Sequence, residues 1–449
     1  MSTTTIHEPE DLELATGTFP TIGPKETKRG ATLAFFAWTL AVYDFIMFGT
    51  LLPRIAEDFG WNEQTALLAN TLVSVGVFVV VVLVGLFVDR LGRRRGMMIT
   101  IGGAALSSLL TAASTGVASL VGFRALSGFG MAEQSVNSTY LNEVFALTEL
   151  EGVKKRRGFF YSLVQTGWPI GALLAAAFIA GINGLFGQES WRLAFLIATV
   201  PALFVLFLRK GIKETPQHRL NTYLRQLRKS GRTEEATEVA ARFGIVDEGP
   251  NPLRAIFGRR YARNTVVLSI AWIVNYFGIT TTSVLGTTML EGVKGVDASM
   301  SLLIIVLSNV VGAAGYLFHG WLGDIIGRKT TIVVGWVLAG VCWTLFVLGP
   351  DDFGYVLVTY MLTLFFLLGP YASLLFLQAE CFDSSCRATG SAFVTAMGQP
   401  GTIIGSAVLT ALVAGSIGLG PAALIVGAGG MVLSGLIMLG TKRVAVIDH

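Results

Sequence analysis

The segment Gly85-Leu-Phe-Val-Asp89-Arg-Leu-Gly92-Arg93-Arg94 ends one apolar stretch of the chain, and Gly320-Trp-Leu-Gly-Asp324-Ile-Ile-Gly327-Arg328-Lys329 ends another. Gly, Asp, Gly, Arg and a second basic residue recur in the same order and spacing, 235 residues apart. An interval this long indicates that a large unit is duplicated, because solenoid repeats recur every 20–50 residues or so. The surrounding sequence must therefore be compared between the two halves.

The composition places both copies in a membrane protein. Of 449 residues, 53% are hydrophobic and only 14% are charged, against about 25% charged in a soluble domain. So few charges cannot cover the surface of a soluble protein, and the apolar content excludes disorder. Three cysteines cannot form a disulfide scaffold. We therefore expect a polytopic membrane protein.

Twelve stretches are long and apolar enough to cross a bilayer as helices, which needs about 20 residues each. Runs such as 73–84 do not alternate in polarity, which excludes barrel strands. The predicted spans lie near 30–52, 65–87, 96–114, 116–142, 158–182, 190–210, 263–289, 298–322, 330–349, 353–379, 389–415 and 420–440. They divide the chain into a tail (1–29), a six-helix bundle (30–210), a charged linker (211–262), a second bundle (263–440) and a short tail (441–449).

Lysine and arginine predict the orientation, because they concentrate in cytoplasmic loops. Outside the spans, only Arg54, Arg192 and Lys294 lie on the side opposite the linker and the termini. We therefore expect both termini and the linker to be cytoplasmic, in an inner or plasma membrane. This rule also accounts for the basic linker, so nucleic-acid binding is not expected.

Two further pairs of matching residues, at equivalent positions in the two halves, support the duplication. Glu143 follows the fourth span as Glu380 follows the tenth, and Arg157 begins the fifth span as Arg387 begins the eleventh. With its repeated loop, the chain resembles the major facilitator superfamily over about residues 30–440. That resemblance implies an all-α fold of two pseudo-symmetric six-helix bundles, secondary active transport by alternating access, and a monomer that can function in the lipid bilayer.

The repeated loops contain charges that could form a cytoplasmic gate. Networks of ion pairs can bias a two-state equilibrium although single pairs contribute little. We expect this gate to stabilise an outward-open state, and the alternative is simple anchoring of the topology by positive charge. Glu143 and Arg157 are 14 residues apart whereas Glu380 and Arg387 are 7 apart, because residues 147–155 form an insertion. The gate residues are Asp89, Arg93, Glu143, Arg157, Asp324, Arg328, Glu380 and Arg387.

Three ionisable residues lie well inside predicted spans, away from the span ends, where charge is costly and marks function. Asp44 is in the first span, and Arg124 and Glu133 are in the fourth, about 13 Å apart along a helix. The sequence from Arg124 to Glu143 resembles the fourth span of the metabolite–proton and organic acid–proton symporter branches, within the sugar-porter-like members of the superfamily. A span-one Asp also pairs with a span-four Arg in proton-coupled sugar porters.

Such a pair suits proton coupling, since a carboxylate ionises beside Arg and takes up a proton when the two separate. We expect Asp44 to carry the proton, Arg124 to be its partner and the only buried cation, and Glu133 to be a second proton site or a substrate ligand. The alternatives are a permanent structural pair and, for Glu133, a hydrogen bond to a neighbouring helix.

Other chemistry is not indicated. The histidines and cysteines show no metal spacing, no phosphate loop or nucleotide signature is present, and no nucleophile–base set is visible. The sequence therefore predicts neither an enzyme nor a metal or cofactor.

Polar and aromatic residues inside the spans are candidates for binding substrate between the bundles. Gln165, Asn275 and Tyr276 rank highest because their spans line the cavity in the superfamily. The Gln-Gln pair typical of sugar porters is absent from span seven, so we expect proton symport of a small carboxylate, aromatic or short aliphatic. The alternatives are symport of a sugar, polyol or other neutral solute, proton-driven efflux, and a sensor that binds without transport. The candidate residues are Tyr43, Asn137, Tyr140, Gln165, Trp168, Trp272, Asn275, Tyr276, Asn309, Tyr360, Tyr371 and Gln399.

Overall fold

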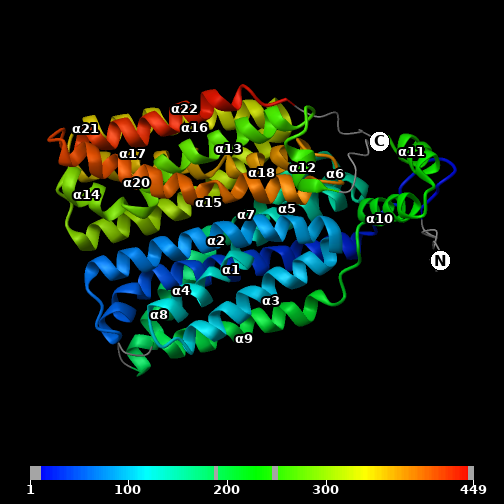
Figure 1. Ribbon diagram of the computed structural model, residues 1–449. Coiled ribbons are helices and arrows are strands. Elements are labelled where there is room, and N and C mark those ends of the chain that lie inside the picture. The colour runs from blue at the N-terminus through cyan, green and yellow to red at the C-terminus, as the bar shows by residue number, and fades with distance from the viewer. Residues whose placement is uncertain (1–11, 187–190, 245–250, 443–449) are drawn as a thin grey trace.

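The computed structural model describes residues 12–186, 191–244 and 251–442, and these residues contain helices but no strands, only two isolated bridges. Figure 1 shows the helices from the two halves of the chain as two adjacent bundles, with the linker helices beyond one end. We call this end of the molecule the linker end. Leu12, the first described residue, packs on the linker helices there.

The first bundle contains nine helical segments: α1 (Pro24–Asp58), α2 (Glu63–Leu91), α3 (Arg93–Ala112), α4 (Val117–Ala125), α5 (Gly128–Leu147), α6 (Glu151–Lys155), α7 (Arg157–Gln165), α8 (Gly167–Phe186) and α9 (Trp191–Arg209). The linker forms α10 (Pro216–Lys229), α11 (Thr233–Arg242) and α12 (Pro252–Ile256). The second bundle contains α13 (Ala262–Ile279), α14 (Gly286–Lys294), α15 (Ala298–Ile326), α16 (Arg328–Leu348), α17 (Phe353–Leu368), α18 (Tyr371–Glu380), α19 (Arg387–Ala396), α20 (Gly398–Ala414), α21 (Leu419–Ala423) and α22 (Gly429–Met438).

Ten helices among the described residues are long and apolar enough to span a membrane. The other two predicted spans correspond to α3 and to the pair α4–α5, which contain more polar residues, including Arg124 and Glu133. The outer faces suit lipid: Val200, Phe204 and Phe207 recur on one side of α9 and are each more than 60% exposed. The expected twelve-span arrangement in two bundles is the one observed.

Several spans are interrupted at matching places in the two bundles. The fourth span breaks between α4 and α5 and the tenth between α17 and α18, while the fifth breaks before α8 and the eleventh before α20. Spans seven and twelve, which both belong to the second bundle and are not equivalent to each other, also contain one π-helical turn each, at Thr280–Val284 and Leu424–Ala428. Breaks at equivalent positions fit the duplication inferred from the sequence.

The glycines of the repeated loops meet two structural requirements, a positive φ angle and close packing between the bundles. Gly92 and Gly327 have φ of 105° and 90°, where glycine is strongly favoured, and each turns the chain from one helix into the next. Gly85 and Gly320 lie where the bundles touch. A Cβ on Gly85 would approach Ala392 Cβ to 2.7 Å, and one on Gly320 would approach Ser162 Cβ to 2.6 Å. The motif therefore brings α2 against α19 and α15 against α7.

Helices α10 and α11 of the linker form a small unit of their own at the linker end (Figure 1). Leu220, Leu224 and Leu227 of α10 pack with residues of α11 and with Leu12 from the segment before α1. Phe19 contacts Phe243, with ring centroids 4.8 Å apart. Residues 12–19 therefore join α10 and α11 in one hydrophobic cluster, so the N-terminal segment is tied to the linker.

Candidate functional site

The first repeated loop carries a buried charge network at the linker end. Arg93 donates to Asp89 (Nη1–Oδ1 3.1 Å) and to Glu143 (Nη2–Oε1 2.9 Å), and all three side chains are fully buried. Arg387 of the second bundle also donates to Glu143, at 3.1 Å. Asp89 in turn accepts from the backbone N–H groups of Ala388 and Thr389. Two anions and two cations therefore join the bundles.

The second loop makes a related arrangement. Asp324 accepts hydrogen bonds from the backbone N–H groups of Gly158 and Phe159, at 3.0 and 2.9 Å. Arg328 forms an ion pair with Glu380, and its guanidinium lies 4.8 Å from the centre of the Phe376 ring. Arg157 begins α7 and is partly exposed. Glu143 of the first bundle is thus paired with Arg387 of the second bundle. Arg157 occupies a less buried position.

The linker is bonded to the same network, which the sequence did not indicate. Thr215 donates to Glu143 Oε2, and Arg225 donates to the backbone oxygen of Asp89. Asn221 donates to the hydroxyl of Ser384 in the second bundle, at 3.0 Å. Helix α10 therefore contacts both bundles beside the network.

Asp44 and Arg124 form an ion pair inside the first bundle, with Nη1 of Arg124 2.9 Å from Oδ2 of Asp44. Ser108 of α3 also donates to Asp44. The guanidinium lies over the rings of Phe48 and Phe195, 4.6 and 5.3 Å from their centres. Nε and Nη2 of Arg124 are buried and have no hydrogen-bond partner in the described part of the chain. The arginine thus keeps N–H groups that a second anion or water can use.

Glu133 is paired with a residue that the sequence analysis did not select. Its carboxylate forms an ion pair with Arg209, at the end of α9, and accepts from the hydroxyl of Thr100. Arg209 is fully buried and also donates to the backbone oxygen of Met97 and to Asn137. The expectation that Arg124 is the only buried cation is wrong. Arg209 ends the sixth span, where basic residues usually mark the cytoplasmic boundary, so the sequence alone does not distinguish it from the residues that set the topology.

Three predicted substrate residues belong to hydrogen-bond pairs within one bundle. Both amide atoms of Asn137 are used, by the backbone oxygen of Ala34 and by Arg209. Asn275 bonds to Ser434 and accepts from the hydroxyl of Tyr371. Tyr360 is fully buried and donates to the backbone oxygen of Thr282. These contacts hold helices together in this conformation.

Other predicted residues lie nearer the boundary between the bundles. Gln165 accepts from Gln134 and donates to Tyr161, whose ring centre is 4.5 Å from that of Phe376 in the second bundle. The ring of Tyr276 is tilted by 31° to that of Trp272, with centroids 5.7 Å apart. A polar chain in one bundle thus approaches aromatic rings in the other.

These rings form an aromatic cluster that the sequence did not single out as a unit. Trp272 contacts both Tyr276 and Tyr371, with centroids 5.7 and 5.3 Å apart, and donates from its ring N–H to Gln378. The ring of Tyr371 also lies 6.0 Å from that of Trp336, between centroids. We call Trp272, Tyr276, Trp336 and Tyr371 the aromatic cluster.

The remaining candidates are less closely connected to it. Tyr43 packs edge-on against Phe178, and Trp168 lies 6.0 Å from Trp38, both in the first bundle. Gln399 is half-buried near the start of α20. No group of three or more metal-binding side chains occurs within the described ranges.

Comparisons with known proteins agree with this architecture. Residues 34–318 match the sequence model described as Major Facilitator Superfamily. The niacin transporter NiaP of Acinetobacter baylyi is 23% identical, over 83% of this chain and 84% of that protein. The gallate transporter of Pseudomonas putida is 24% identical, over 84% and 83%. The 4-hydroxybenzoate transporter PcaK of Acinetobacter baylyi is 24% identical, over 84% and 85%.

Solved structures show the same fold. The proton:xylose symporter XylE aligns with a TM-score of 0.68 at 17% identity, covering 92% of this chain and 94% of that one. The human organic anion transporter MFSD10 aligns with a TM-score of 0.69 at 15% identity, covering 92% and 99%. At these identities the likeness concerns the fold alone.

Proposed function

Because the chain belongs to the major facilitator superfamily, and is therefore a multi-pass membrane transporter rather than an enzyme, we propose that it imports a small organic acid together with a proton. The observation that carries the proposal is the Asp44–Arg124 pair, which is buried in the first bundle. A carboxylate there changes its proton affinity when its arginine partner moves or binds another anion. Proton uptake and substrate binding are coupled in this way.

Arg124 suits a shared role between the proton carrier and the substrate. One N–H group is committed to Asp44, while Nε and Nη2 have no partner within the described residues. A buried guanidinium with spare donors favours a second carboxylate, and such charge-assisted hydrogen bonds are stronger than neutral ones. When substrate binds, Arg124 is drawn from Asp44, which then holds its proton.

The substrate class follows from the aromatic cluster and the relatives together. Niacin, gallate and 4-hydroxybenzoate, named for three relatives, each combine an aromatic ring with a carboxylate. Trp272, Tyr276 and Tyr371 offer ring faces and edges, which contribute about 0.5–1.5 kcal/mol per aromatic contact beyond burial. We therefore favour an aromatic carboxylate over a short aliphatic one.

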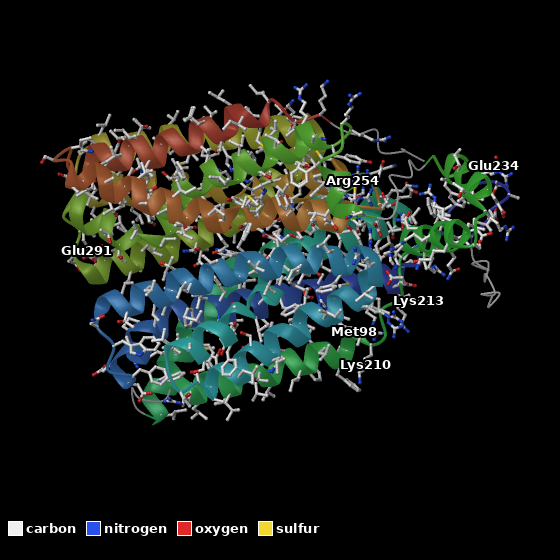
Figure 2. All side chains as sticks on the ribbon, viewed as in Figure 1. Met98, Lys210, Lys213, Glu234, Arg254 and Glu291 are labelled. Atoms are coloured by element: carbon white, nitrogen blue, oxygen red, sulfur yellow. The ribbon has the colours of Figure 1, made fainter. Side chains whose placement is uncertain are left out.

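The linker-end network serves as the gate of this transporter. It joins the bundles through Arg387, Asp89 and Asp324, and the concentration of lysine and arginine at the linker end supports placing it in the cytoplasm. Figure 2 shows basic side chains gathered there, near Lys210, Lys213 and Arg254. The conformation with these bonds intact is closed to the cytoplasm, and breaking them opens it.

The test is uptake of radiolabelled aromatic acids into proteoliposomes with an imposed proton gradient. An inward gradient drives uptake by the wild type, whereas Asp44→Asn loses gradient-driven uptake but keeps exchange of internal for external substrate. Asp58→Asn, on the same helix in a surface pair with Arg192, retains gradient-driven uptake. Normal proton-driven uptake by Asp44→Asn contradicts the coupling role of Asp44.

The same assay separates the alternatives. Uptake driven by an outward proton gradient indicates efflux by antiport, and uptake of sugars but not acids indicates a neutral-solute symporter. Binding without any uptake indicates a sensor. The transporter is expected to work as a monomer, so reconstitution at low protein density should leave the rate per molecule unchanged.

A further inference from the structure

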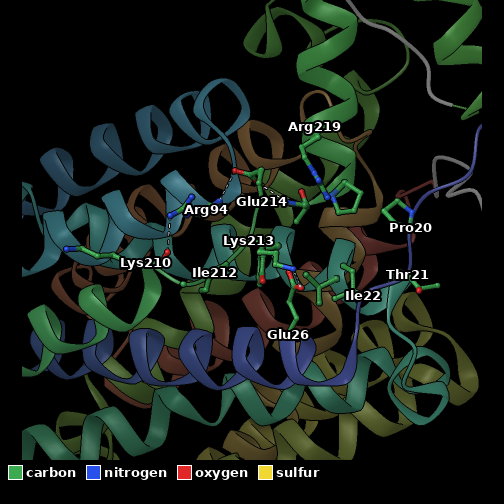
Figure 3. Close-up of a pocket in the computed structure, with 15 residues that line it drawn as sticks. Pro20, Thr21, Ile22, Glu26, Arg94, Lys210, Ile212, Lys213, Glu214 and Arg219 are labelled. Carbon is green, nitrogen blue, oxygen red and sulfur yellow. Dashed lines mark hydrogen bonds and ion pairs between the residues drawn. The ribbon is translucent and has the colours of Figure 1, made fainter. Parts of the chain in front are cut away.

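A cavity of about 520 Å³ opens at the linker end, outside the boundary between the bundles (Figure 3). It lies between the segment before α1, the start of α3, the last turns of α5 and the connection from α9 to α10. Its volume falls within the range of about 300–1,000 Å³ usual for small-molecule sites. Its lining is Pro20, Thr21, Ile22, Glu26, Arg94, Tyr140, Val144, Lys210, Gly211, Ile212, Lys213, Glu214, Thr215, Pro216 and Arg219.

The walls of this cavity are fixed by hydrogen bonds. Ile22 donates to the backbone oxygen of Leu147 at 2.7 Å and accepts from Glu149 at 3.0 Å, which holds the N-terminal segment in place. Glu214 accepts from the backbone N–H groups of Arg93 and Arg94 at the start of α3. The cavity is therefore bounded by ordered backbone on opposite sides.

Its lining carries more positive than negative charge. The cations are Arg94, Lys210, Lys213 and Arg219, against the carboxylates of Glu26 and Glu214. Both carboxylates are already engaged, Glu26 with Lys213 at 3.3 Å and Glu214 with backbone N–H groups.

Burial affects the ionisation of two of these groups. It raises the pKa of the Glu214 carboxyl and lowers the pKa of the Arg219 guanidinium, because both groups are partly withdrawn from water. A net positive, partly desolvated lining favours an anion.

The mouth of the cavity lies beside the lipid-facing surface. Val200, Phe204 and Phe207 form the exposed apolar stripe of α9, and Lys210 follows directly at its end. The ammonium of Lys210 lies 5.5 Å from the centre of the Phe207 ring. A side chain at this level meets the polar headgroups where the hydrocarbon region ends, and basic pockets at such positions bind anionic headgroups.

We propose that this cavity binds a phosphate-bearing anion, held by Lys213 and Arg219, with Lys210 at its rim beside the lipid-facing stripe of α9. The apolar stripe leading to Lys210 favours the headgroup of an anionic phospholipid, with its acyl chains along α9, over a soluble phosphate ester. Neither the substrate nor the proton is involved, so the site is independent of the transport function proposed above.

The test measures binding directly on the purified full-length protein in a neutral detergent. Thermal unfolding is followed during titration with short-chain phosphatidylglycerol, with short-chain phosphatidylcholine, and with glycerol 3-phosphate. Phosphatidylglycerol is expected to raise the unfolding temperature and phosphatidylcholine is not. The double variant Lys210→Gln/Lys213→Gln should bind phosphatidylglycerol about 30-fold more weakly, because each basic residue contributes about 1 kcal/mol near a membrane surface.

The matched control is Lys154→Gln/Lys155→Gln, which removes two exposed lysines from α6 outside the cavity. It should bind as the wild type does. Should the double variant fold poorly, Lys210→Gln alone changes one exposed side chain and should still weaken binding about fivefold. Stabilisation by glycerol 3-phosphate as strong as that by phosphatidylglycerol supports the site but identifies a soluble ligand. Equal weakening in the control, or no stabilisation by either phosphate compound, overturns the proposal.

Discussion

Asp89 and Asp324 make equivalent contacts from opposite bundles, each accepting hydrogen bonds from the first backbone N–H groups of a helix in the other bundle. For Asp89 the donors are Ala388 and Thr389 at the start of α19, at 3.2 and 2.7 Å. For Asp324 they are Gly158 and Phe159 at the start of α7. A helix begins with unpaired N–H groups and a partial positive charge, so a carboxylate is stabilised there. The duplicated motif thus places a helix cap across the boundary between bundles.

Replacing these caps should open the linker end. Asp89→Asn removes the negative charge that lies at the start of α19 and pairs with Arg93. Asp324→Asn removes the negative charge at the start of α7. Cys386, at the N-cap of α19 and fully buried, serves as a native reporter. We expect its labelling by a thiol reagent to be faster in Asp89→Asn, with less effect from Asp324→Asn, because Cys386 adjoins the Asp89 contact.

Cys342, buried within α16, should label at the same rate in all variants and reports any general unfolding. Unchanged labelling of Cys386 in Asp89→Asn, at the same rate as in Asp58→Asn, would contradict the gate.

Substituting a glycine of the repeated motif should also open the linker end, by disturbing packing between the bundles rather than by removing a charge. In Gly85→Ala the new methyl group would lie 2.7 Å from Ala392 Cβ and 2.9 Å from the backbone oxygen of Ala388. The bundles must then separate locally, at a cost of about 1–3 kcal/mol. We expect faster labelling of Cys386 and weaker uptake. Gly122→Ala, where a Cβ meets nothing within 4 Å, is the matched control and should behave as wild type. Tolerance of Gly85→Ala at full uptake would exclude close packing there as a requirement.

The sequence was sufficient to predict these contacts in part. The repeat identified Asp89 and Asp324, and the scarcity of charge within the spans identified Asp44, Arg124 and Glu133. The sequence did not predict that Arg209 is buried, because an arginine at the end of a span can extend to the membrane interface or turn into the bundle. Residue spacing does not distinguish these two orientations. The aromatic cluster depends on which faces of helices far apart in the sequence meet, such as those of α13 and α18 that carry Trp272 and Tyr371, and a single sequence does not contain this information.

The Glu133–Arg209 pair gives a prediction about stability. Both side chains are buried, so removing one partner leaves an uncompensated charge and costs about 3–5 kcal/mol. Arg209→Met and Glu133→Gln should each lower the free energy of unfolding, with Arg209→Met the more severe because it also removes the hydrogen bonds to Met97 and Asn137. The double variant Glu133→Gln/Arg209→Met should recover much of that loss. Chemical unfolding of the four proteins, arranged as a double-mutant cycle, measures the coupling. Additive losses would show that the two residues act independently.

His218 makes the linker sensitive to pH. Burial, with smaller effects from Arg93, Arg225 and Arg95, lowers the pKa of His218 to about 2. In the unfolded chain its pKa is about 6.5, so the unfolded state takes up a proton below pH 6.5 and the folded state does not. The stability that the neutral ring contributes is therefore complete above pH 6.5 and is lost as the pH falls from 6.5 towards 2, by up to about 1.4 kcal/mol per pH unit.

Comparing His218→Gln with the wild type isolates this effect from that of Glu214, whose pKa burial raises. A raised pKa acts in the opposite sense, since Glu214 favours the folded state as the pH falls. Between pH 7.5 and pH 5 the wild type should lose up to about 2 kcal/mol more stability than His218→Gln. Thr222→Val, which removes only the hydroxyl 3.3 Å from the ring Nε2, should keep the pH dependence of the wild type. Chemical unfolding at pH 7.5, 6 and 5 measures all three proteins. If the wild type and His218→Gln lose stability in parallel, the ring is not held neutral in the folded linker.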